Sequence, residues 1–183
     1  MTAPGGAGRR PRLALVLGGG AARGIAHVGV ARVLEAEGIR PDLIVGTSAG
    51  ALAGVFLAAG VSAARAEACA ATLRWRRLVR PAVGRLGLAS NDRIGQLLER
   101  ALPVRRFEEL ATPFACVATD LETFEPVILR EGELASAVRA SCAVPGLVLP
   151  VARDGRLLVD GGVVQNVPVA AARQLGAELV VAV

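Results

Sequence analysis

The N-terminal third of the chain alternates unbroken aliphatic runs with segments of helical spacing. Leu13 to Leu17 is an aliphatic run that predicts a strand, and Gly24 to Glu37 has the apolar spacing of a helix that stops at a glycine. Leu43 to Val45 predicts a second strand, and Ser48 to Ala59 a second helix that again stops at a glycine. Strands that are apolar on both faces occur in parallel sheets covered by helices on both sides. We therefore expect an α/β protein with a mostly parallel central sheet.

The rest of the chain continues this alternation. Hydrophobic spacing predicts helices over Arg65 to Arg80, Asp92 to Leu102 and Glu133 to Ala140, and extended segments over Phe114 to Thr119 and Pro126 to Leu129. Three further features complete the pattern: a hairpin of Val148 to Val151 and Arg156 to Val159 around Asp154-Gly155, a helix from Pro168 to Leu175, and a strand from Glu178 to Val183. Asn166 is suited to cap the last helix.

The length and composition predict one packed domain. The chain has 183 residues, of which 53% are hydrophobic and 20% charged. We expect residues 1–12 to form a flexible N-terminal segment and residues 13–183 to form the domain, with the weakest ordering before Arg9 and over Val83 to Ala89. The sequence ends on an apolar strand without a polar tail, which is compatible with truncation of a longer protein.

One apolar stretch is long enough to be mistaken for a membrane span. Leu43 to Ala64 carries no charge and has Gly50 and Gly54 at the spacing of a helix-packing motif. Gly46, Thr47 and Ser48 nevertheless interrupt it where a strand would turn. We favour a buried strand, turn and helix over a transmembrane helix.

The cysteines and the single histidine give no sign of a metal site. Cys69, Cys116 and Cys142 are odd in number and have neither CxxC nor metal-site spacing. They are interpreted as buried thiols of a protein in a reducing compartment, which predicts a cytoplasmic location. No His, Cys or carboxylate cluster has metal-ligand spacing. We therefore expect no metal and no other cofactor.

The positive charge of the chain is carried by arginine alone. Arginine supplies all 21 basic residues against 16 acidic ones, and the net charge is +5. The absence of lysine indicates a compositional bias, so net charge alone says little about partners. A local cluster is more informative: Arg74, Trp75, Arg76, Arg77 and Arg80. It suits either peripheral contact with an anionic membrane surface, at the inner face of the membrane, or a solvated helix face. Nucleic acid is not expected as a partner, since the chain has no tyrosine for base stacking.

Ser48 lies between two glycines at a predicted strand-to-helix turn. Gly46 and Gly50 form with it the pattern GxSxG, which in this context is typical of a nucleophile elbow. The glycines permit a tight turn, and the helix that follows offers free amides and positive potential. Ser48 is therefore a candidate nucleophile, and an idle serine in a glycine-rich turn is the alternative.

A second glycine cluster stands between the first strand and the first helix. Gly18, Gly19 and Gly20 have bare backbone amides that suit an anion, either a phosphate or the oxyanion of a tetrahedral intermediate. A dinucleotide site is the rival hypothesis, but its third glycine would fall at Arg23. Arg23 suits a loop that keeps its own shape or meets a phosphate.

Asp160 follows an aliphatic strand and precedes Gly161 and Gly162. A carboxylate in that position is partly desolvated, which raises its pKa and makes it a better base. Taken alone, this pattern also fits an ordinary turn.

Four motifs resemble, in order and spacing, those of the patatin-like phospholipase family: GGGAARGIAHVGV, IVGTSAGAL, ASCAVPG and LLVDGGVVQNVPV. The resemblance runs from Leu13 to Val183 and implies a three-layer α/β/α patatin-like fold with a Ser-Asp dyad. It places Ser48 on the nucleophile and Asp160 on the aspartate, and it assigns to the oxyanion loop Gly18, Gly19, Gly20, Arg23 and Gly24. Gln165 departs from the family, in which asparagine is common at this position.

These features together predict a lipid acyl hydrolase, that is, a phospholipase A or lysophospholipase-type serine esterase that acts on phospholipids or other lipid esters. His27 lies on the apolar stripe of the first helix, so it is interpreted as a core histidine and Asp160 as the base. Two alternatives remain: a nucleotide- or phosphate-binding module that uses Gly18 to Gly20, and a catalytically silent membrane-associated adaptor. The presence of both Ser48 and Asp160 argues against the adaptor.

Overall fold

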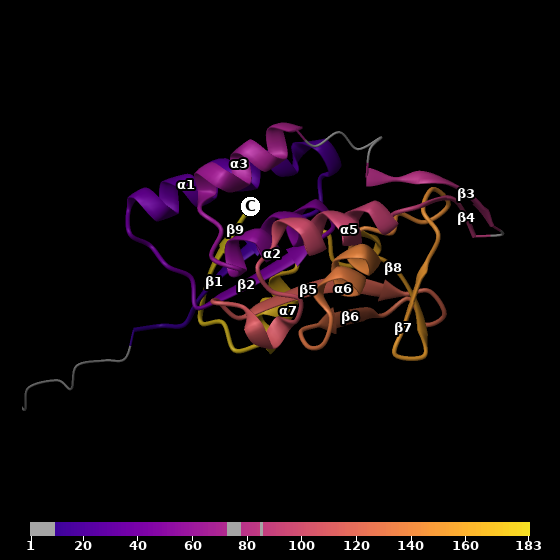
Figure 1. Ribbon diagram of the computed structural model, residues 1–183. Helices are drawn as coiled ribbons and strands as arrows, with labels where there is room; N and C mark the ends of the chain where they lie inside the picture. The colour runs from indigo at the N-terminus through magenta and orange to yellow at the C-terminus, as the bar shows by residue number, and fades with distance from the viewer. Residues whose placement is uncertain (1–9, 73–77, 85) are drawn as a thin grey trace, which may run out of the picture.

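The computed structural model describes residues 10–72, 78–84 and 86–183 and has three layers (Figure 1). Within these residues the central sheet contains seven strands. Their bounds are β1 Leu13–Leu17, β2 Leu43–Thr47, β5 Phe114–Asp120, β6 Pro126–Leu129, β7 Val151–Arg153, β8 Arg156–Asp160 and β9 Leu179–Ala182. The predicted α/β class with a mostly parallel sheet is confirmed, because β9, β1, β2 and β5 lie side by side and parallel.

Strand β5 organises the sheet, because it pairs with three other strands. Its first part pairs with β2, where Val117 lies opposite Thr47. Its last part pairs with the antiparallel strand β8, where Ala118 lies opposite Asp160. Strand β6 pairs with both parts of β5, so it occupies the other edge. Strands β2 and β8 therefore run toward each other along one edge of β5 and end at adjacent positions.

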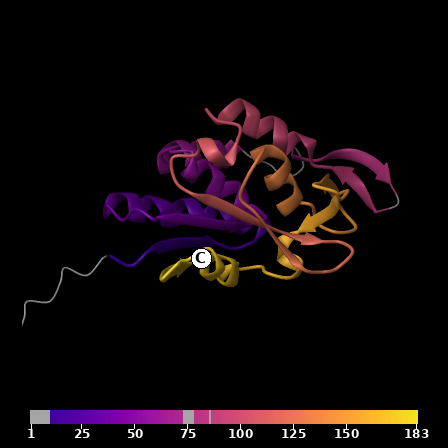
Figure 2. The same cartoon turned by 90° about the horizontal axis from the view of Figure 1, so that it is seen from below.

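Helices cover both faces of this sheet. Their bounds are α1 Ile25–Ala36, α2 Ala49–Ala58, α3 Ala63–Thr72, α5 Asp92–Ala101, α6 Leu134–Ser141 and α7 Val169–Gln174, with short 3₁₀ turns η1 Ala21–Gly24, η2 Phe107–Glu109 and η3 Gly161–Val163. In Figure 2 the yellow helix α7 lies below the sheet, and α2 and α5 lie above it. This arrangement gives the chain its α/β/α layers.

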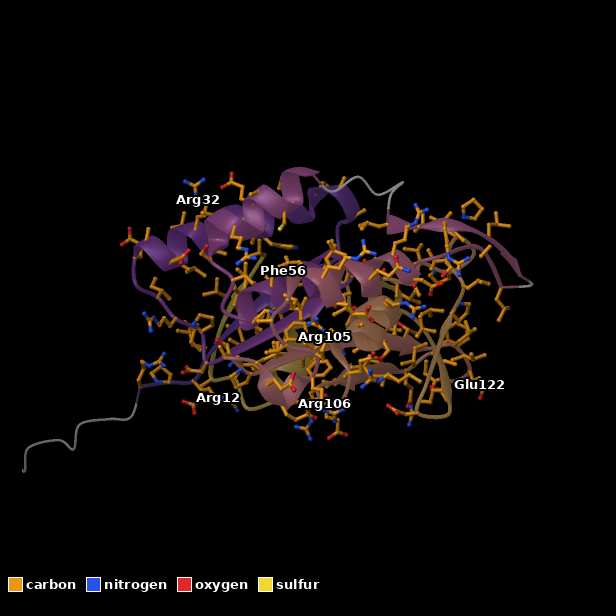
Figure 3. The ribbon with its side chains drawn as sticks, viewed as in Figure 1. Arg12, Arg32, Phe56, Arg105, Arg106 and Glu122 are labelled. Carbon is orange, nitrogen blue, oxygen red and sulfur yellow. The ribbon has the colours of Figure 1, made fainter. Side chains whose placement is uncertain are left out.

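Alternate residues of the strands build two cores, one on each face. Leu15, Leu17 and Ile44 point into the larger core, which α2, α5 and α6 complete. Ala14 and Val16 point the other way, into the smaller core under α7. Figure 3 shows Phe56 of α2, which belongs to the larger core. Because both faces are covered, these strands have no polar face, which explains their unbroken aliphatic runs.

The cluster around Arg80 departs from the predicted helix. Helix α3 ends at Thr72, and Arg80 begins β3 (Arg80–Gly84), which forms a two-stranded antiparallel ribbon with β4 (Gly87–Ser90). Pro81 disfavours helical backbone at the residue before it. The described residues of Val83 to Ala89, where the sequence predicts weak ordering, belong to these two strands and to the turn between them. The other residues of the basic cluster, Arg74, Trp75, Arg76 and Arg77, lie outside the described residues.

Two further predictions concern chain termini and caps. Residues 1–9 of the expected flexible segment lie outside the described residues, but Arg12 donates to the carbonyl of Leu175 over 2.6 Å (Figure 3). The predicted cap is wrong, because α7 begins after Pro168 and has no side-chain cap. Asn166 instead offers its carbonyl oxygen to the amide of Gly19, at 2.9 Å.

The apolar stretch Leu43 to Ala64 forms a strand, a turn and the helix α2, as the sequence predicts. Among the described residues, none of the helices combines the length and the apolar character that crossing a bilayer requires.

The point where β8 ends against β5 leaves no room for a side chain. A Cβ atom on Gly161 would lie 2.2 Å from the carbonyl oxygen of Val117, whereas one on Gly29 of α1 would meet nothing within 4 Å. We expect Gly161→Ala to lower the free energy of unfolding by about 1–3 kcal/mol through overpacking. Gly29→Ala, the matched control, should raise it by roughly 0.5–1 kcal/mol through helix propensity. Urea unfolding measures both, and equal stability of the two variants would contradict the close approach.

Candidate active site

Ser48 occupies a strained turn between β2 and α2. Its φ of 54° and ψ of −119° lie in a region that non-glycine residues rarely adopt. The flanking glycines allow this turn, because a Cβ on Gly46 would lie 2.5 Å from the carbonyl oxygen of Gly50, and one on Gly50 would lie 2.0 Å from that of Leu17. The turn has the geometry of a nucleophile elbow.

The hydroxyl of Ser48 is directed at Asp160 rather than at the start of α2. Ser48 Oγ donates to Asp160 Oδ2 over 2.6 Å and does not cap the helix. The other carboxylate oxygen, Asp160 Oδ1, accepts the amide proton of Gly162 over 2.7 Å. Both side chains are buried, with 8% of Ser48 and 6% of Asp160 exposed. The structure thus brings together the two residues that the motifs singled out.

Burial raises the pKa of Asp160 above the usual range of a carboxyl group. The hydrogen bonds from Ser48 and from the amide of Gly162 act in the opposite direction and lower it. The net upward shift makes the carboxylate a stronger base than one in water.

Ser141 joins the two halves of the site through β5. Its Oγ donates to the carbonyl oxygen of Val117 over 2.6 Å and accepts the amide proton of Ser48 over 2.9 Å. Thr119 Oγ1 donates to the carbonyl oxygen of Asp160 over 2.9 Å. Neither role was predicted from the sequence, although Ser141 belongs to the motif ASCAVPG.

Cys142 Sγ lies 3.2 Å from the carbonyl oxygen of Ser48 and donates to it. Burial, assisted by the nearby charge of Asp160, raises the pKa of this thiol well above its usual range. Burial also raises the pKa of Cys116 to about 12. Both are buried thiols, as the sequence predicts, whereas Cys69 is only partly buried.

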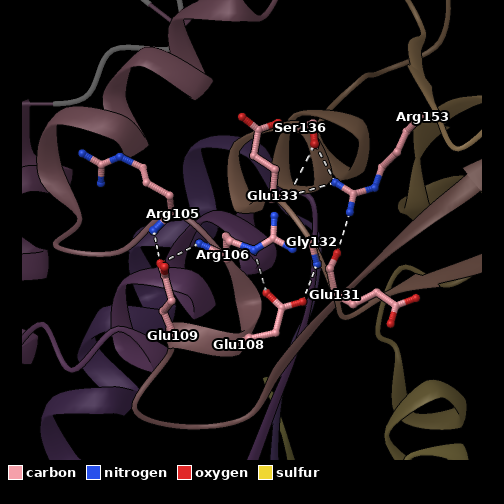
Figure 4. A network of polar contacts seen from close by, with 9 residues as sticks. All are labelled: Arg105, Arg106, Glu108, Glu109, Glu131, Gly132, Glu133, Ser136 and Arg153. Atoms are coloured by element: carbon pink, nitrogen blue, oxygen red, sulfur yellow. Dashed lines mark hydrogen bonds and ion pairs between the residues drawn. The ribbon is translucent and has the colours of Figure 1, made fainter.

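A polar network holds the other end of α6, the helix that carries Ser141 (Figure 4). Arg153 donates to the carbonyl oxygens of Glu131 and Glu133, over 2.6 and 2.8 Å, and to Ser136 Oγ over 2.5 Å. These bonds fix the first turn of α6 and thereby the direction in which its last turn meets β5.

The glycine loop packs directly against the elbow. The amide of Gly18 donates to the carbonyl oxygen of Val183 and that of Gly19 to Asn166, each over 2.9 Å. Within the described part of the chain, the Gly20 amide has no protein acceptor. A Cβ on Gly24 would lie 2.6 Å from that of Ala49, so η1 is in close contact with α2. Arg23 lies exposed on η1.

His27 lies beneath this loop. Among the described residues, its side chain makes no hydrogen bond to the side chain of Ser48 or of Asp160. It is buried, and its Nε2 lies 2.8 Å from the carbonyl oxygen of Gly18. Its placement in the apolar interior agrees with the predicted core histidine. Gln165, which departs from the family pattern, accepts a hydrogen bond from Thr47 Oγ1 through its backbone carbonyl at 2.9 Å.

The model of the patatin-like phospholipase family matches residues 15–173. The chain belongs to this family. An uncharacterised NTE family protein of Mycobacterium tuberculosis is 38% identical over 176 residues, which cover 94% of this chain and 49% of that protein. Human patatin-like phospholipase domain-containing protein 6 is 33% identical over 181 residues, covering 93% of this chain and 13% of that protein. The chain thus spans about half of the mycobacterial relative.

The solved structure of VipD from Legionella pneumophila shares the fold. It superimposes with a TM-score of 0.68 over 85% of this chain and 46% of that one, at 16% sequence identity. The predicted three-layer patatin-like fold is therefore confirmed.

An apolar cavity of about 430 Å³ adjoins the nucleophile elbow of this patatin-like domain. Ala49, which follows Ser48, and Gly24 of the glycine loop form part of its wall. The other walls come from α1, α2, α3 and Leu78. The volume lies in the range of sites for small molecules. Among the residues that the structure describes, no group of three or more His, Cys, Asp or Glu side chains could hold a metal.

The raised pKa of Asp160 predicts a stability cost at neutral pH. Below the ordinary carboxyl pKa the group is protonated in both states, but as the pH rises the unfolded chain loses this proton first, so the free energy of unfolding falls. Asp160→Asn removes the charge but keeps the size, and its oxygen can still accept from the Gly162 amide while its NH2 group donates to Ser48 Oγ. We expect it to be more stable than the parent at pH 7, by a margin that shrinks toward pH 3.

Asp120→Asn is the control with the opposite sign. The pKa of Asp120 is lowered, chiefly by the backbone amide of Glu122, so its ionised form stabilises the fold. This variant should lose stability at pH 7. Urea unfolding across the pH range measures both variants, and an Asp160→Asn protein that is less stable than the parent at pH 7 would contradict the assignment.

Proposed function

We propose that this chain is the catalytic domain of a lipid acyl hydrolase, a serine esterase of the phospholipase A or lysophospholipase type. The observation that carries the proposal is the 2.6 Å hydrogen bond from Ser48 Oγ to Asp160 Oδ2 at a strained strand-to-helix turn. A hydroxyl held against a desolvated carboxylate is an activated nucleophile that needs no histidine.

In the proposed reaction, Asp160 accepts the proton of Ser48 as Oγ attacks the ester carbonyl. The tetrahedral intermediate collapses when the alcohol leaves with that proton, and an acyl-enzyme remains. Water then attacks the acyl group as Asp160 takes its proton; the second tetrahedral intermediate releases the carboxylic acid, and Asp160 returns the proton to Ser48 Oγ. Each step uses only the two side chains, the substrate and water.

The proposed oxyanion donors are the amides of Gly20 and Ala49. The Gly18 and Gly19 amides already donate to backbone carbonyls, so these residues support the loop rather than bind the oxyanion. Ala49 is the first residue of α2, where the amide is free of an intrahelical partner and the helix dipole is positive. Arg23 and Gly24 complete the loop, and the exposure of Arg23 supports a role in meeting the phosphate of a phospholipid.

The apolar cavity supports a lipid substrate. It lies between the glycine loop and α3, beside Ala49, and it is lined by alanine, leucine, isoleucine, valine and phenylalanine side chains together with Cys69. An acyl chain bound there would place its ester carbonyl at the elbow. The name of the human relative, a patatin-like phospholipase domain-containing protein, agrees with this substrate class.

The alternatives explain fewer observations. A nucleotide- or phosphate-binding module would use the amides of Gly18 to Gly20, of which two are engaged in the backbone. A silent adaptor has no need of a buried carboxylate next to a strained serine. Membrane contact stays a prediction, since four residues of the basic cluster lie outside the described residues and Arg80 is paired with Asp92 over 2.6 Å.

Replacement of the nucleophile tests the proposal. Ser48→Ala should abolish hydrolysis of lysophospholipid and p-nitrophenyl esters and the covalent labelling by a fluorophosphonate, because both need Oγ. Asp160→Asn should lower kcat by about 10²- to 10⁴-fold, since the general base is lost. Circular dichroism confirms folding, and turnover by a folded Ser48→Ala protein would show that the nucleophile lies elsewhere.

Filling the cavity tests the acyl site. Ala70→Phe on the cavity side of α3 should lower kcat/KM for long-chain p-nitrophenyl esters by about tenfold or more and leave acetyl esters unaffected, because only long chains reach α3. Ala68→Phe, on the exposed side of the same helix, is the matched control. The same loss for acetyl and long-chain esters would argue against an acyl chain in this cavity.

A further inference from the structure

We propose that His27 is a positioning residue that holds the peptide unit between Gly18 and Gly19 and thereby aims the amide of Gly20 at the oxyanion. This inference rests on the proposed function, because it assigns a role in the same site. It gives the buried histidine a task other than that of a base.

The peptide unit between Gly18 and Gly19 is held at both of its ends. Its carbonyl oxygen lies 2.8 Å from His27 Nε2, and its amide donates to the carbonyl oxygen of Asn166 over 2.9 Å. In a trans peptide these two groups point in opposite directions, so the two bonds fix the orientation of the whole plane. The next amide along the chain is that of Gly20.

The protonation of the imidazole follows from its partner. A carbonyl oxygen only accepts hydrogen bonds, so His27 Nε2 must carry the proton. Nδ1 is then a bare acceptor in a side chain that is 6% exposed, and among the described residues it has no partner. A buried acceptor without a partner costs stability, which an aliphatic side chain at this place on α1 would avoid. The donated hydrogen bond is the feature that an aliphatic side chain could not supply.

The glycine loop lies so close to Ser48 that a small rotation of its backbone would change the position of its amides relative to Ser48 Oγ. A Cβ built on Gly19 would lie 3.4 Å from that of Ser48 and 2.5 Å from Asn166 Oδ1. A glycine backbone is intrinsically free to rotate, so this loop needs external bonds to keep one conformation. Loss of the bond from His27 would release the plane and displace the Gly20 amide.

Two variants separate the hydrogen bond from the packing. His27→Leu fills the apolar site without a donor, and His27→Gln places an amide N–H at the same distance along the side chain. We expect His27→Leu to lower kcat on p-nitrophenyl esters about 10²-fold with KM nearly unchanged, because a displaced oxyanion donor affects the transition state more than binding. His27→Gln should recover most of this loss.

Nuclear magnetic resonance gives a readout that does not depend on activity. The parent protein should have the proton on Nε2 of His27, and hydrogen exchange of the Gly19 amide should be faster in His27→Leu than in the parent and in His27→Gln. A proton on Nδ1, or an unchanged kcat in folded His27→Leu, would overturn the inference. An equal loss of kcat in both variants would also overturn it. If the parent hydrolyses no ester while the exchange data follow this pattern, the proposed function fails and the loop-holding role stands.

Discussion

The site depends on the meeting of two strands, β2 and β8, end to end along one edge of β5. The parallel strand delivers Ser48 and the antiparallel strand delivers Asp160, and the register on β5 places their last residues opposite the neighbouring positions Val117 and Ala118. The carbonyl oxygen of Val117 lies at the centre of this junction. It accepts the hydroxyl of Ser141 and passes so close to Gly161 that no side chain fits there. The 2.6 Å contact of Ser48 Oγ with Asp160 Oδ2 is thus a consequence of strand register.

The junction of β2 and β8 lowers the folding stability, and the packing of the two cores offsets this loss. Ser48 is held in a strained backbone conformation, and Asp160 is withdrawn from water. Neither would persist in a loosely packed turn. They persist because the strands that carry them are covered on both faces, so that relaxation of the turn would have to disturb the packing of α2 and α6 against the sheet.

Much of the architecture could be predicted from local patterns. The bounds of β1 and β6 agree with their aliphatic runs, and Ser48 and Asp160, which two glycine-flanked motifs singled out, are joined by a hydrogen bond. Local patterns did not reveal Ser141, because its bond to Ser48 depends on which strand lies beside which. The ribbon of β3 and β4 also escaped prediction, since it is short and its amides at Leu88 and Ala89 bond to the distant carbonyl of Leu147. Asn166 failed as a cap because α7 begins after Pro168, so Asn166 lies before the N-cap position.

The residues of the candidate site and the α3 wall of the apolar cavity come from different parts of the fold. Ser48 and Asp160 come from strand ends that β5 holds in register, whereas one wall of the apolar cavity comes from α3, in the segment between α2 and β5. Helix α3 packs on α1, where Arg32, labelled in Figure 3, pairs with Glu67 over 2.9 Å. The described residues between α2 and β5 add no strand to the central sheet. The side chains that α3 contributes to the cavity, Ala66, Cys69 and Ala70, can therefore differ in size without moving Ser48 relative to Asp160, whereas α5 of the same segment belongs to the larger core. A change of these side chains would alter which molecules fit the cavity, while Ser48 Oγ and Asp160 Oδ2 stay 2.6 Å apart.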